Sequence, residues 1–337
     1  MSNKVKIGVI GAGGIANSVH LPSLVEIEDC DLVAVCDLRE ERAREAAEKY
    51  NIPHVYSSQY EMMKKEQLDG VLVLVDCDRT FRAAWECLEN GWHVLLEKPA
   101  GITSYQAESL ARLAAKCGKI CAVAMNRRHV PLVQHVFKKM QELTTITQVD
   151  GVFIKNNDIA DTWTYASAFV CDIVHAADLV RYLAGSEVKD AATVVARHNS
   201  PVDNAWSSVM RFENGVTGTL RANYQTGGRV HTFEIHGPGA SAFINLGFGD
   251  AACDAKILYF SGQQVYSLAA AGTNEQKIEV IDGREIAGGQ EYHQYYGYKH
   301  EDIDFIRCIQ TGEKPMCTID DAVGSMKMVE KLLASAL

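Results

Sequence analysis

The stretch VKIGVIGAGGIA at residues 5–16 decides the fold. An apolar run typical of a buried strand leads directly into a segment that fits the pattern G-x-G-x-x-G/A. The first glycine permits a tight turn, the second lets a pyrophosphate approach the backbone, and the alanine keeps the following helix close to the sheet. Free N–H groups at the start of that helix favour a phosphate. The pattern therefore predicts a dinucleotide-binding turn made by Gly11, Gly13, Gly14, Ile15 and Ala16.

An acidic residue follows at the position that this reading requires. Asp37 comes directly after a second apolar run, at 32–36, and lies 21 residues beyond Ala16. A carboxylate there can accept hydrogen bonds from the ribose hydroxyls of NAD, and it would repel the 2′-phosphate of NADP. We therefore predict NAD, with NADP less favoured. The alternative is a purely structural turn followed by a surface aspartate.

The first part of the chain alternates short apolar runs with longer amphipathic ones. The runs 5–10, 32–36, 71–75, 93–96 and 119–125 are typical of buried parallel strands, and 39–50, 79–90 and 104–116 of helices. This rhythm predicts an α/β domain of the Rossmann type, a doubly wound parallel sheet covered on both faces, over residues 1–126.

The pattern changes after residue 126. Helices are expected at 131–143 and 169–184, and period-two alternation predicts strands at 206–212, 216–224, 231–236, 242–246 and 256–260. Asn214-Gly215 between two of these runs is a strong hairpin signal. Two helices, at 299–310 and 320–336, close the chain. We expect an α+β domain over residues 127–337 with an antiparallel sheet.

Charge and composition exclude several partner classes. The 337 residues carry a formal net charge of −10, which opposes binding to a phosphate backbone, so nucleic acid is not an expected partner. No apolar run is long enough for a membrane span or a signal peptide core. The ten cysteines form no C-x-x-C pair, and several lie in apolar runs as free thiols. We expect a cytoplasmic protein.

The segment Glu97-Lys98-Pro99 follows the run 93–96, at the edge of the sheet where ligands bind in open α/β folds. An ammonium group at this edge can hydrogen-bond a substrate oxygen and stabilise negative charge that develops there. The alternative is a solvated Glu/Lys pair at the end of a strand.

Together, the glycine turn with His20, Glu97-Lys98-Pro99 and the segment NRRHVP at 126–131 resemble the Gfo/Idh/MocA family of sugar and inositol dehydrogenases. The resemblance implies a Rossmann domain, a second domain with a large, mostly antiparallel sheet, and a homodimer or homotetramer formed through that sheet. It implies that Lys98 is the catalytic lysine. It also places at the cofactor the residues Val75, Asp76, Thr80, Glu97, Lys98 and Asn126. The chain departs from the family at 75–77, where relatives usually carry Thr-Pro-Asn.

The segment 171–178 resembles the family's catalytic D-x-G-x-H-x-x-D stretch. On an α-helix His175 lies away from the apolar stripe and one turn from Asp172, an arrangement that suits a general base with its orienting acid. In the family the acid is four residues before the histidine, where this chain has Cys171. There are two alternatives, which we consider less favoured: His175 is an ordinary packed histidine, or the helix carries a metal site. Asp178 is expected to pair with Arg181 or to make a packing contact.

Aromatic side chains mark the expected substrate end. Trp163 and Tyr165 follow the first strand of the second domain, where relatives place sugar-contacting residues, and their rings suit the apolar faces of a pyranose or cyclitol. The substrate set also includes Arg127, Asp172 and His175. A second cluster, the tyrosines of 292–298, is typical of a core or a subunit interface, and a substrate role is the alternative.

The sequence thus predicts an NAD-dependent oxidoreductase acting on a secondary hydroxyl of a sugar, glycoside or cyclitol. Lys98, His175 and Asp172 are the predicted catalytic residues. Two alternatives stay open: an enzyme that retains NAD and cleaves glycosides through transient oxidation, and an NAD-binding regulatory protein without catalysis.

Overall fold

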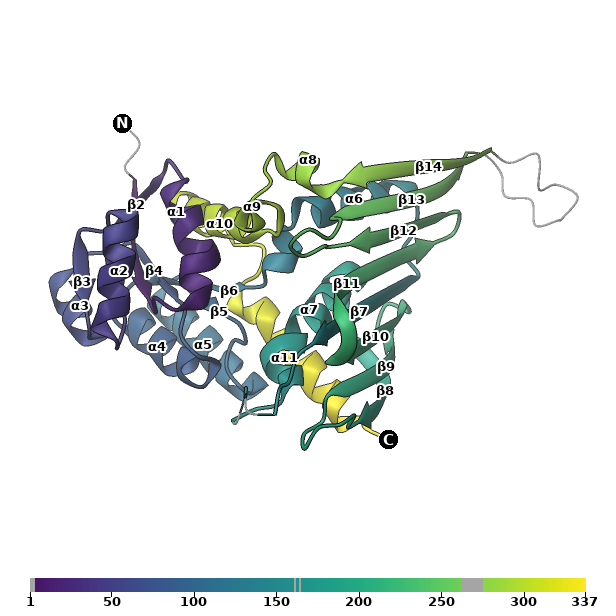
Figure 1. The fold of residues 1–337 in the computed structure, drawn as a ribbon, viewed down its shortest axis with the longest axis horizontal. Helices are drawn as coiled ribbons and strands as arrows, with labels where there is room; N and C mark the ends of the chain where they lie inside the picture. The colour runs from purple at the N-terminus through teal and green to yellow at the C-terminus, as the bar shows by residue number, and fades with distance from the viewer. Residues whose placement is uncertain (1–3, 161, 164, 262–274) are drawn as a thin grey trace, which may run out of the picture. The chain divides into compact units, whose positions relative to one another are not determined.

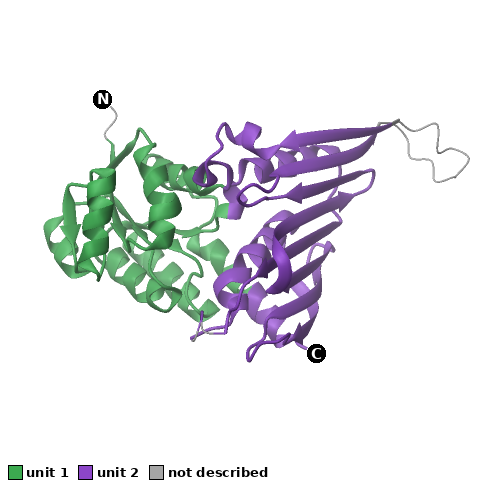
Figure 2. Cartoon of the chain, viewed as in Figure 1, with its two compact units in different colours: residues 1–126, 297–327 green, residues 127–296, 328–337 purple. Residues whose placement is uncertain are grey.

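The computed structural model describes residues 4–160, 162–163, 165–261 and 275–337. The chain divides into two compact units (Figure 2): residues 1–126 with 297–327, called unit 1, and residues 127–296 with 328–337, called unit 2. The sequence assigned all of 127–337 to the second domain, and the structure differs over the segment Gly297–Lys327. The reason is apolar packing, because Phe305 and Ile306 of helix α10 (Tyr298–Thr311) belong to the same buried cluster as Val9.

Unit 1 is built on a six-stranded parallel sheet in the order β3-β2-β1-β4-β5-β6. The strands are β1 (Val5–Ile10), β2 (Cys30–Cys36), β3 (His54–Tyr56), β4 (Gly70–Val73), β5 (His93–Glu97) and β6 (Cys121–Ala124). The five predicted strands are confirmed. The strand β3 was not predicted, because three residues are too few to show a period.

Helices cover both faces of this sheet. Leu95 of β5 belongs to the cluster that contains Val9 and Phe305, whereas its neighbours Val94 and Leu96 point to the other face and are equally buried. The helices of unit 1 (Figure 1) are α1 (Leu21–Val25), α2 (Glu40–Tyr50), α3 (Gln59–Lys65), α4 (Cys77–Glu89), α5 (Ser104–Cys117) and α10, joined by the start of α11 (Ile319–Ala334). This is the doubly wound α/β arrangement.

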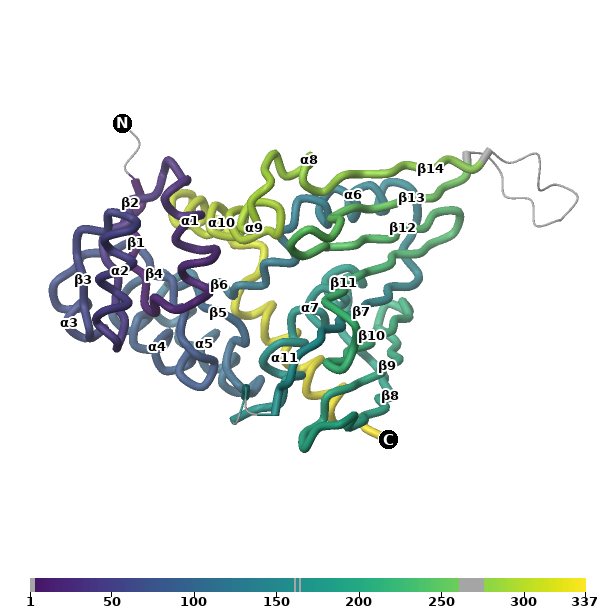
Figure 3. The backbone as a smooth tube through the Cα atoms, in the orientation of Figure 1, coloured from purple at the N-terminus to yellow at the C-terminus, as the bar shows by residue number. Residues whose placement is uncertain are grey.

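Unit 2 is built on an eight-stranded sheet in the order β14-β13-β12-β11-β7-β10-β9-β8, which can be followed along the tube in Figure 3. All neighbouring pairs are antiparallel except β7 with β10. The strands are β7 (Gln148–Asn156), β8 (Val188–Ala196), β9 (Ala205–Phe212), β10 (Thr217–Asn223), β11 (Gln225–Gly237), β12 (Ala240–Asn245), β13 (Asp254–Ser261) and β14 (Glu275–Asp282). The hairpin predicted at Asn214-Gly215 is confirmed between β9 and β10.

One face of this sheet is packed and the other is open. Along β10, Leu220 and Ala222 are buried, and Tyr224 just beyond the strand is buried with them, while Arg221 is exposed. Helices α6 (Pro131–Leu143) and α7 (Val174–Ala184) pack on the sheet. The other helices of unit 2 are η3 (Phe169–Ile173), α8 (Gly283–Ala287), α9 (Tyr292–Tyr295), part of the short η2 (Asn126–His129) and the end of α11. Within the described ranges, no helix is both long and apolar enough to cross a membrane.

Candidate functional site

The glycine turn leaves open space beside its backbone. Gly11 has a φ of +101°, and a Cβ there would lie 2.3 Å from the carbonyl oxygen of Leu74, so only glycine fits. A Cβ on Gly13 or Gly14 would meet nothing within 4 Å. The chain turns helical at Gly14 and passes into the π-helical segment η1 (Ala16–His20), a form often found at functional sites. The turn therefore fits a bound pyrophosphate.

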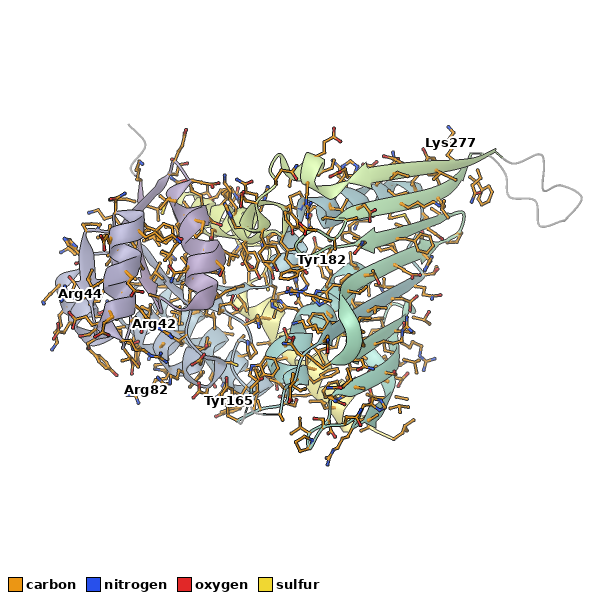
Figure 4. The ribbon with its side chains drawn as sticks, viewed as in Figure 1. Arg42, Arg44, Arg82, Tyr165, Tyr182 and Lys277 are labelled. Atoms are coloured by element: carbon orange, nitrogen blue, oxygen red, sulfur yellow. The ribbon has the colours of Figure 1, made fainter. Side chains whose placement is uncertain are left out.

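Asp37 is held against this turn by backbone hydrogen bonds. Its Oδ2 accepts from the N–H of Ala12 at 2.8 Å, and its Oδ1 accepts from the N–H of Arg39 at 2.8 Å. Each carboxylate oxygen keeps a further lone pair for a ribose hydroxyl. Asp37 lines a cavity of about 590 Å³, a size suited to a nucleotide. The lining also includes Gly11, Gly13, Val75, Asp76 and two of the arginines labelled in Figure 4, Arg42 and Arg82.

Three other residues predicted to bind the cofactor support the structure of unit 1 around the cavity. The Thr80 side chain is fully buried and its hydroxyl is 3.2 Å from the carbonyl oxygens of both Val75 and Asp76, at the start of α4. Ala16 is fully buried, and Ile15 packs against the core. Thr80 therefore stabilises the turn that presents Val75 and Asp76 to the cavity.

The Glu-Lys-Pro segment lies at the end of β5 and is anchored from within unit 1. The backbone N–H of Lys98 donates to Oε2 of Glu97 at 3.0 Å, and Oε1 of Glu97 is 3.7 Å from Nε2 of His20. The peptide bond between Lys98 and Pro99 is cis. His20 is fully buried, and its Nδ1 is 2.9 Å from Oδ1 of Asp302 in α10.

Buried charge surrounds His20. Burial opposes protonation, but the charges of Asp302 and Glu97 outweigh it and raise the pKa of His20 well above its ordinary value. Glu301 beside Asp302 is also buried, and desolvation raises its pKa well above its ordinary value. A protonated His20 therefore bridges two carboxylates, one of which holds the backbone of Lys98. The sequence reading noted His20 only through the resemblance, and it missed Asp302 and Glu301.

The predicted catalytic helix differs from an ideal α-helix. It starts as the π-helix η3, which contains Cys171 and Asp172, and becomes α-helical only from Val174. All residues from Ala168 to Val180 are buried, so exposure does not distinguish the faces of this helix, and the non-core position expected for His175 stays a prediction. Its side chain is enclosed, and the residue is 6% exposed. Asp172 is 8% exposed, and the π-turn changes its angle relative to His175.

Asp172 accepts two hydrogen bonds from other elements of unit 2. Its Oδ2 is 2.5 Å from Nζ of Lys155 in β7 and 2.7 Å from the hydroxyl of Tyr224. Burial lowers the pKa of Lys155 to about 8, with Asp172 opposing the shift and Arg127 and Arg229 adding to it. Burial, followed by the charge of Asp172, raises the pKa of Tyr224, which therefore stays a donor. Asp172 is thus a fixed anion inside unit 2.

Further polar and aromatic side chains gather near Lys155. The imidazole of His231 stacks on Phe153 with ring centroids 4.0 Å apart, and its Nδ1 is 3.0 Å from the hydroxyl of Tyr296. The Arg127 guanidinium lies 5.3 Å from the Phe153 ring centroid and 5.8 Å from that of Tyr296. Burial and the cations Arg127, Arg229 and Lys155 lower the pKa of His231 well below its ordinary value, so this histidine is neutral.

Asp178 has a structural role. Its two carboxylate oxygens accept from Nε and Nη2 of Arg128, at 2.8 and 2.6 Å, in a pair that is almost fully buried. The expectation that Asp178 pairs with Arg181 is therefore wrong, since Arg181 pairs with Glu187. The bidentate pair ties the segment after β6 to α7.

The remaining predicted substrate residues lie on the loop between β7 and η3. Trp163 is half-buried and Tyr165, labelled in Figure 4, is 39% exposed. Asp161 and Thr164, which belong to the same predicted segment, lie outside the described residues. Asn126 is fully buried.

The sequence did not point to Lys155, Tyr224 or His231 as site residues, and it placed Tyr296 in a cluster for which a core or interface role was favoured. A signal for two of the missed residues was present. Lys155 and His231 occupy inward-facing positions of β7 and β11, in step with Phe153 and Phe233. A charged or polar residue at a buried position of a strand is rare unless it is paired or functional.

One group of potential metal ligands occurs among the described residues. Ligand atoms of Asp150, Glu234 and His236 lie within 4.8 Å of one another on the open face of the unit 2 sheet, all half-buried. His231 and His236 face opposite sides of the sheet, as the sequence predicted. The three side chains already bond to neighbours, since Asp150 accepts from Thr219 and His236 is 3.2 Å from Glu234.

Comparison with known proteins agrees with this geometry. Residues 5–125 match the oxidoreductase family with the NAD-binding Rossmann fold named Gfo/Idh/MocA, and residues 139–243 match the C-terminal domain of the same family. Myo-inositol 2-dehydrogenase of Thermotoga maritima is 28% identical over 69% of this chain and 74% of its own. The NAD-dependent scyllo-inositol 2-dehydrogenase of Bacillus subtilis is 22% identical over 97% of this chain and 93% of its own.

Solved structures share the whole fold. A dehydrogenase from Chromobacterium violaceum superimposes with a TM-score of 0.86 at 18% identity, covering 99% of this chain and 96% of its own. GenD2 of gentamicin A biosynthesis, solved in complex with NAD, gives a TM-score of 0.80 at 20% identity, covering 99% and 95%. With both domains matched to one family and its nucleotide-binding turn in place, this chain belongs to the Gfo/Idh/MocA oxidoreductases.

Proposed function

We propose that the protein is an NAD-dependent dehydrogenase that oxidises a secondary hydroxyl of a sugar, glycoside or cyclitol. The observation that carries the proposal is the pairing of Asp37 with the glycine turn on one cavity. The inositol dehydrogenases among its relatives support the substrate class. Asp37 supports NAD over NADP, because a carboxylate would repel a 2′-phosphate.

Backbone N–H groups from Gly13 to Ala16 would hold the pyrophosphate, and Asp37 the adenosine ribose. Val75 and Asp76 line the same cavity. When bound, a nicotinamide supplies the carbon that accepts a hydride. Glu97 and Asn126 are proposed to complete the cofactor site by resemblance to the family, Glu97 acting through its hold on the backbone of Lys98.

Proton chemistry falls to three side chains. Lys98 donates a hydrogen bond to the reacting oxygen of the substrate and stabilises negative charge there. His175 removes the hydroxyl proton as general base, and Asp172 stabilises the positive charge that builds up inside unit 2. Arg127, Trp163 and Tyr165 are proposed substrate contacts. The fixed position of Asp172, bonded to both Lys155 and Tyr224, supports this role.

We also propose a homodimer or homotetramer formed through the open face of the unit 2 sheet. That face carries the exposed apolar residues Val194, Val209, Phe243, Ile278 and Val280. Exposed apolar side chains gathered on one face are typical of a protein–protein interface. Light scattering on purified protein, with Val209→Lys as the interface variant, checks this. A cytoplasmic location is supported by the ten cysteines, all among the described residues, because none of them forms a disulfide bond, as in a reducing compartment.

The near-ultraviolet absorbance of reduced nicotinamide tests the function. Purified protein is mixed with NAD and a panel of sugars, glycosides and inositols, after a first spectrum has checked for cofactor retained from purification. The proposal expects absorbance to rise with at least one polyol. A flat response across the panel, together with no NAD binding, would contradict it.

A further inference from the structure

Three cationic side chains of unit 2 lie close together on its packed side. Arg127 follows β6 in the chain, Lys155 lies in β7 and Arg229 lies in β11. We call them the cationic cluster. All three act electrostatically on His231, and both arginines act on Lys155. Lys155 lies 4.7 Å and Arg127 5.3 Å from the same Phe153 ring centroid.

Arg127 is the unusual member of this cluster. The residue is 3% exposed, and its Nε and Nη1 atoms have no hydrogen-bond partner in the described part of the chain. None of the ion pairs in the described ranges includes it, whereas its neighbour Arg128 holds Asp178 with two hydrogen bonds. Buried guanidinium groups are costly without a partner, so the partner of Arg127 is expected to come from a ligand.

The charge balance gives the sign of that ligand. Among the described residues, Asp172 is the carboxylate bonded to Lys155. Arg127 and Arg229 are permanently charged, and Lys155 is mostly protonated at neutral pH. His231 is neutral. Within the described ranges the Arg127 guanidinium is therefore a buried positive charge that no carboxylate pairs, which calls for an anionic ligand.

We propose that the cationic cluster binds an oxyanion of the substrate, a carboxylate or a phosphate, so that the substrate is an acidic sugar or cyclitol and not a neutral one. This rests on the proposed function, because it names the substrate class of that same site. Guanidinium groups bind planar carboxylates and phosphates in bidentate fashion, and such charge-assisted bonds are stronger than bonds to sugar hydroxyls.

The aromatic neighbours support the same reading. The guanidinium of Arg127 lies 5.3 Å from the ring centroid of Phe153 and 5.8 Å from that of Tyr296, and that of Arg229 lies 3.9 Å from the ring centroid of Phe248. The hydroxyl of Tyr292 accepts a hydrogen bond of 3.3 Å from Nη2 of Arg229. Cation–π contacts with these rings restrict the motion of both guanidinium groups, which lowers the ordering cost of binding an anion.

The test is a comparison of binding within matched pairs. Isothermal titration calorimetry is run on the whole protein, saturated with NAD, against D-glucose and D-glucuronate, D-galactose and D-galacturonate, and myo-inositol and myo-inositol 1-phosphate. The uronates and the phosphate separate the two oxyanion sources. The same titrations use Arg127→Met and, as a matched control on the surface of unit 2, Arg197→Met; Arg197 pairs with Asp203 and is 62% exposed at its side chain. Circular dichroism and a thermal melt establish that each variant is folded.

We expect the acidic member of at least one pair to bind at least about tenfold more tightly than its neutral partner. This is the gain in affinity expected from one charged hydrogen bond. That preference should disappear in Arg127→Met and persist in Arg197→Met. Equal binding within every pair, or a folded Arg127→Met protein that keeps the preference, would overturn the inference. Calorimetry measures binding without turnover, so the two hypotheses can fail separately. If the protein oxidises neutral sugars and shows no preference for binding acidic ones, only this inference is refuted. A protein that binds acidic sugars but never reduces NAD would refute only the proposed function.

Discussion

The backbone N–H of Ala12 donates a 2.8 Å hydrogen bond to Oδ2 of Asp37, which joins the glycine turn after β1 to the end of β2. The two segments therefore present one surface to the nucleotide cavity. The carboxylate is fixed before any ligand arrives, so little ordering cost remains for ribose binding.

Replacing Asp37 by serine should shift cofactor preference from NAD toward NADP. The change removes the charge that repels a 2′-phosphate, while Arg39 and Arg42 line the same cavity and remain as donors. We expect the ratio of the two dissociation constants to move by about tenfold or more, the effect of one charge-assisted contact. Fluorescence titration with NADH and NADPH measures it. Tighter binding of NADPH by the unmodified protein would show that Asp37 has been misread.

Lys98→Ala should abolish turnover and leave NAD affinity nearly unchanged. The amine serves the reacting oxygen, whereas the pyrophosphate is held by backbone N–H groups of the glycine turn. Titration of the variant with NADH, beside a steady-state assay, separates the two effects. A large loss of cofactor binding would instead assign Lys98 a structural role.

Asp172→Asn should lower turnover and shift its pH dependence, while Cys171→Ala should do much less. The asparagine removes the charge that Lys155 and Tyr224 share. Cys171 is buried and a thiol offers no fixed negative charge. Rate profiles against pH for the two variants give the comparison. If Cys171→Ala were the more damaging change, proton chemistry would have to be reassigned, first to Lys98.

The free energy of unfolding should fall as pH rises above about 6, because two buried groups of unit 1 have raised pKa values. His20 is held protonated by Asp302 and Glu97, so its stabilising contribution is complete below its unfolded pKa of about 6.5 and is lost as pH rises through the folded value. Burial raises the pKa of Glu301, so the folded protein keeps this proton and releases it on unfolding; its contribution also falls as pH rises, starting at its unfolded pKa of about 4.3.

Denaturant unfolding at pH 5.5 and at pH 8 measures this change. Glu301→Gln keeps the shape of the side chain but removes its titratable proton. The unfolding free energy of the variant should therefore change less with pH than that of the parent protein. A parent protein more stable at pH 8 than at pH 5.5 would refute the assignment.

Asp178→Asn should cost about 3–5 kcal/mol of unfolding free energy, because it removes the carboxylate charge that faces the buried Arg128 guanidinium. The matched control is Arg211→Met, which breaks an exposed ion pair with Asp190 and should cost only about 0–1 kcal/mol. Chemical denaturation of both variants gives the difference. Equal costs for the two would mean that the buried pair is not a stability element.

The Rossmann part of the fold could be predicted because its signals are local. The glycine turn, Asp37 and the five apolar strands are read from short windows of sequence, and each is where it was expected. Two features were not predicted. Strand β3 is too short to show a pattern. The packing of α10 in unit 1 depends on contacts between residues far apart in the chain, such as Phe305 and Val9.

The site was predicted less completely, for the same physical reason. Lys98, His175 and Asp172 stand in recognisable motifs, but the partners of Asp172 come from strands that approach it only in the folded chain. The π-turn of η3 was also invisible, since one extra residue in a helical turn leaves no periodic trace over five residues. Asp178 was misassigned because Arg128 lies 50 residues away in sequence.

Direct hydride transfer is the central claim, and isotope transfer tests it most directly. A sugar or cyclitol that supports NAD reduction is prepared with deuterium on the carbon that is to be oxidised. It is incubated with the protein and NAD, and the mass of the NADH formed is measured by mass spectrometry. Hydride transfer from the labelled carbon should give NADH one mass unit heavier than that from the unlabelled substrate, formed in equal amount with the ketone. Unlabelled NADH, or ketone without NADH, would contradict it.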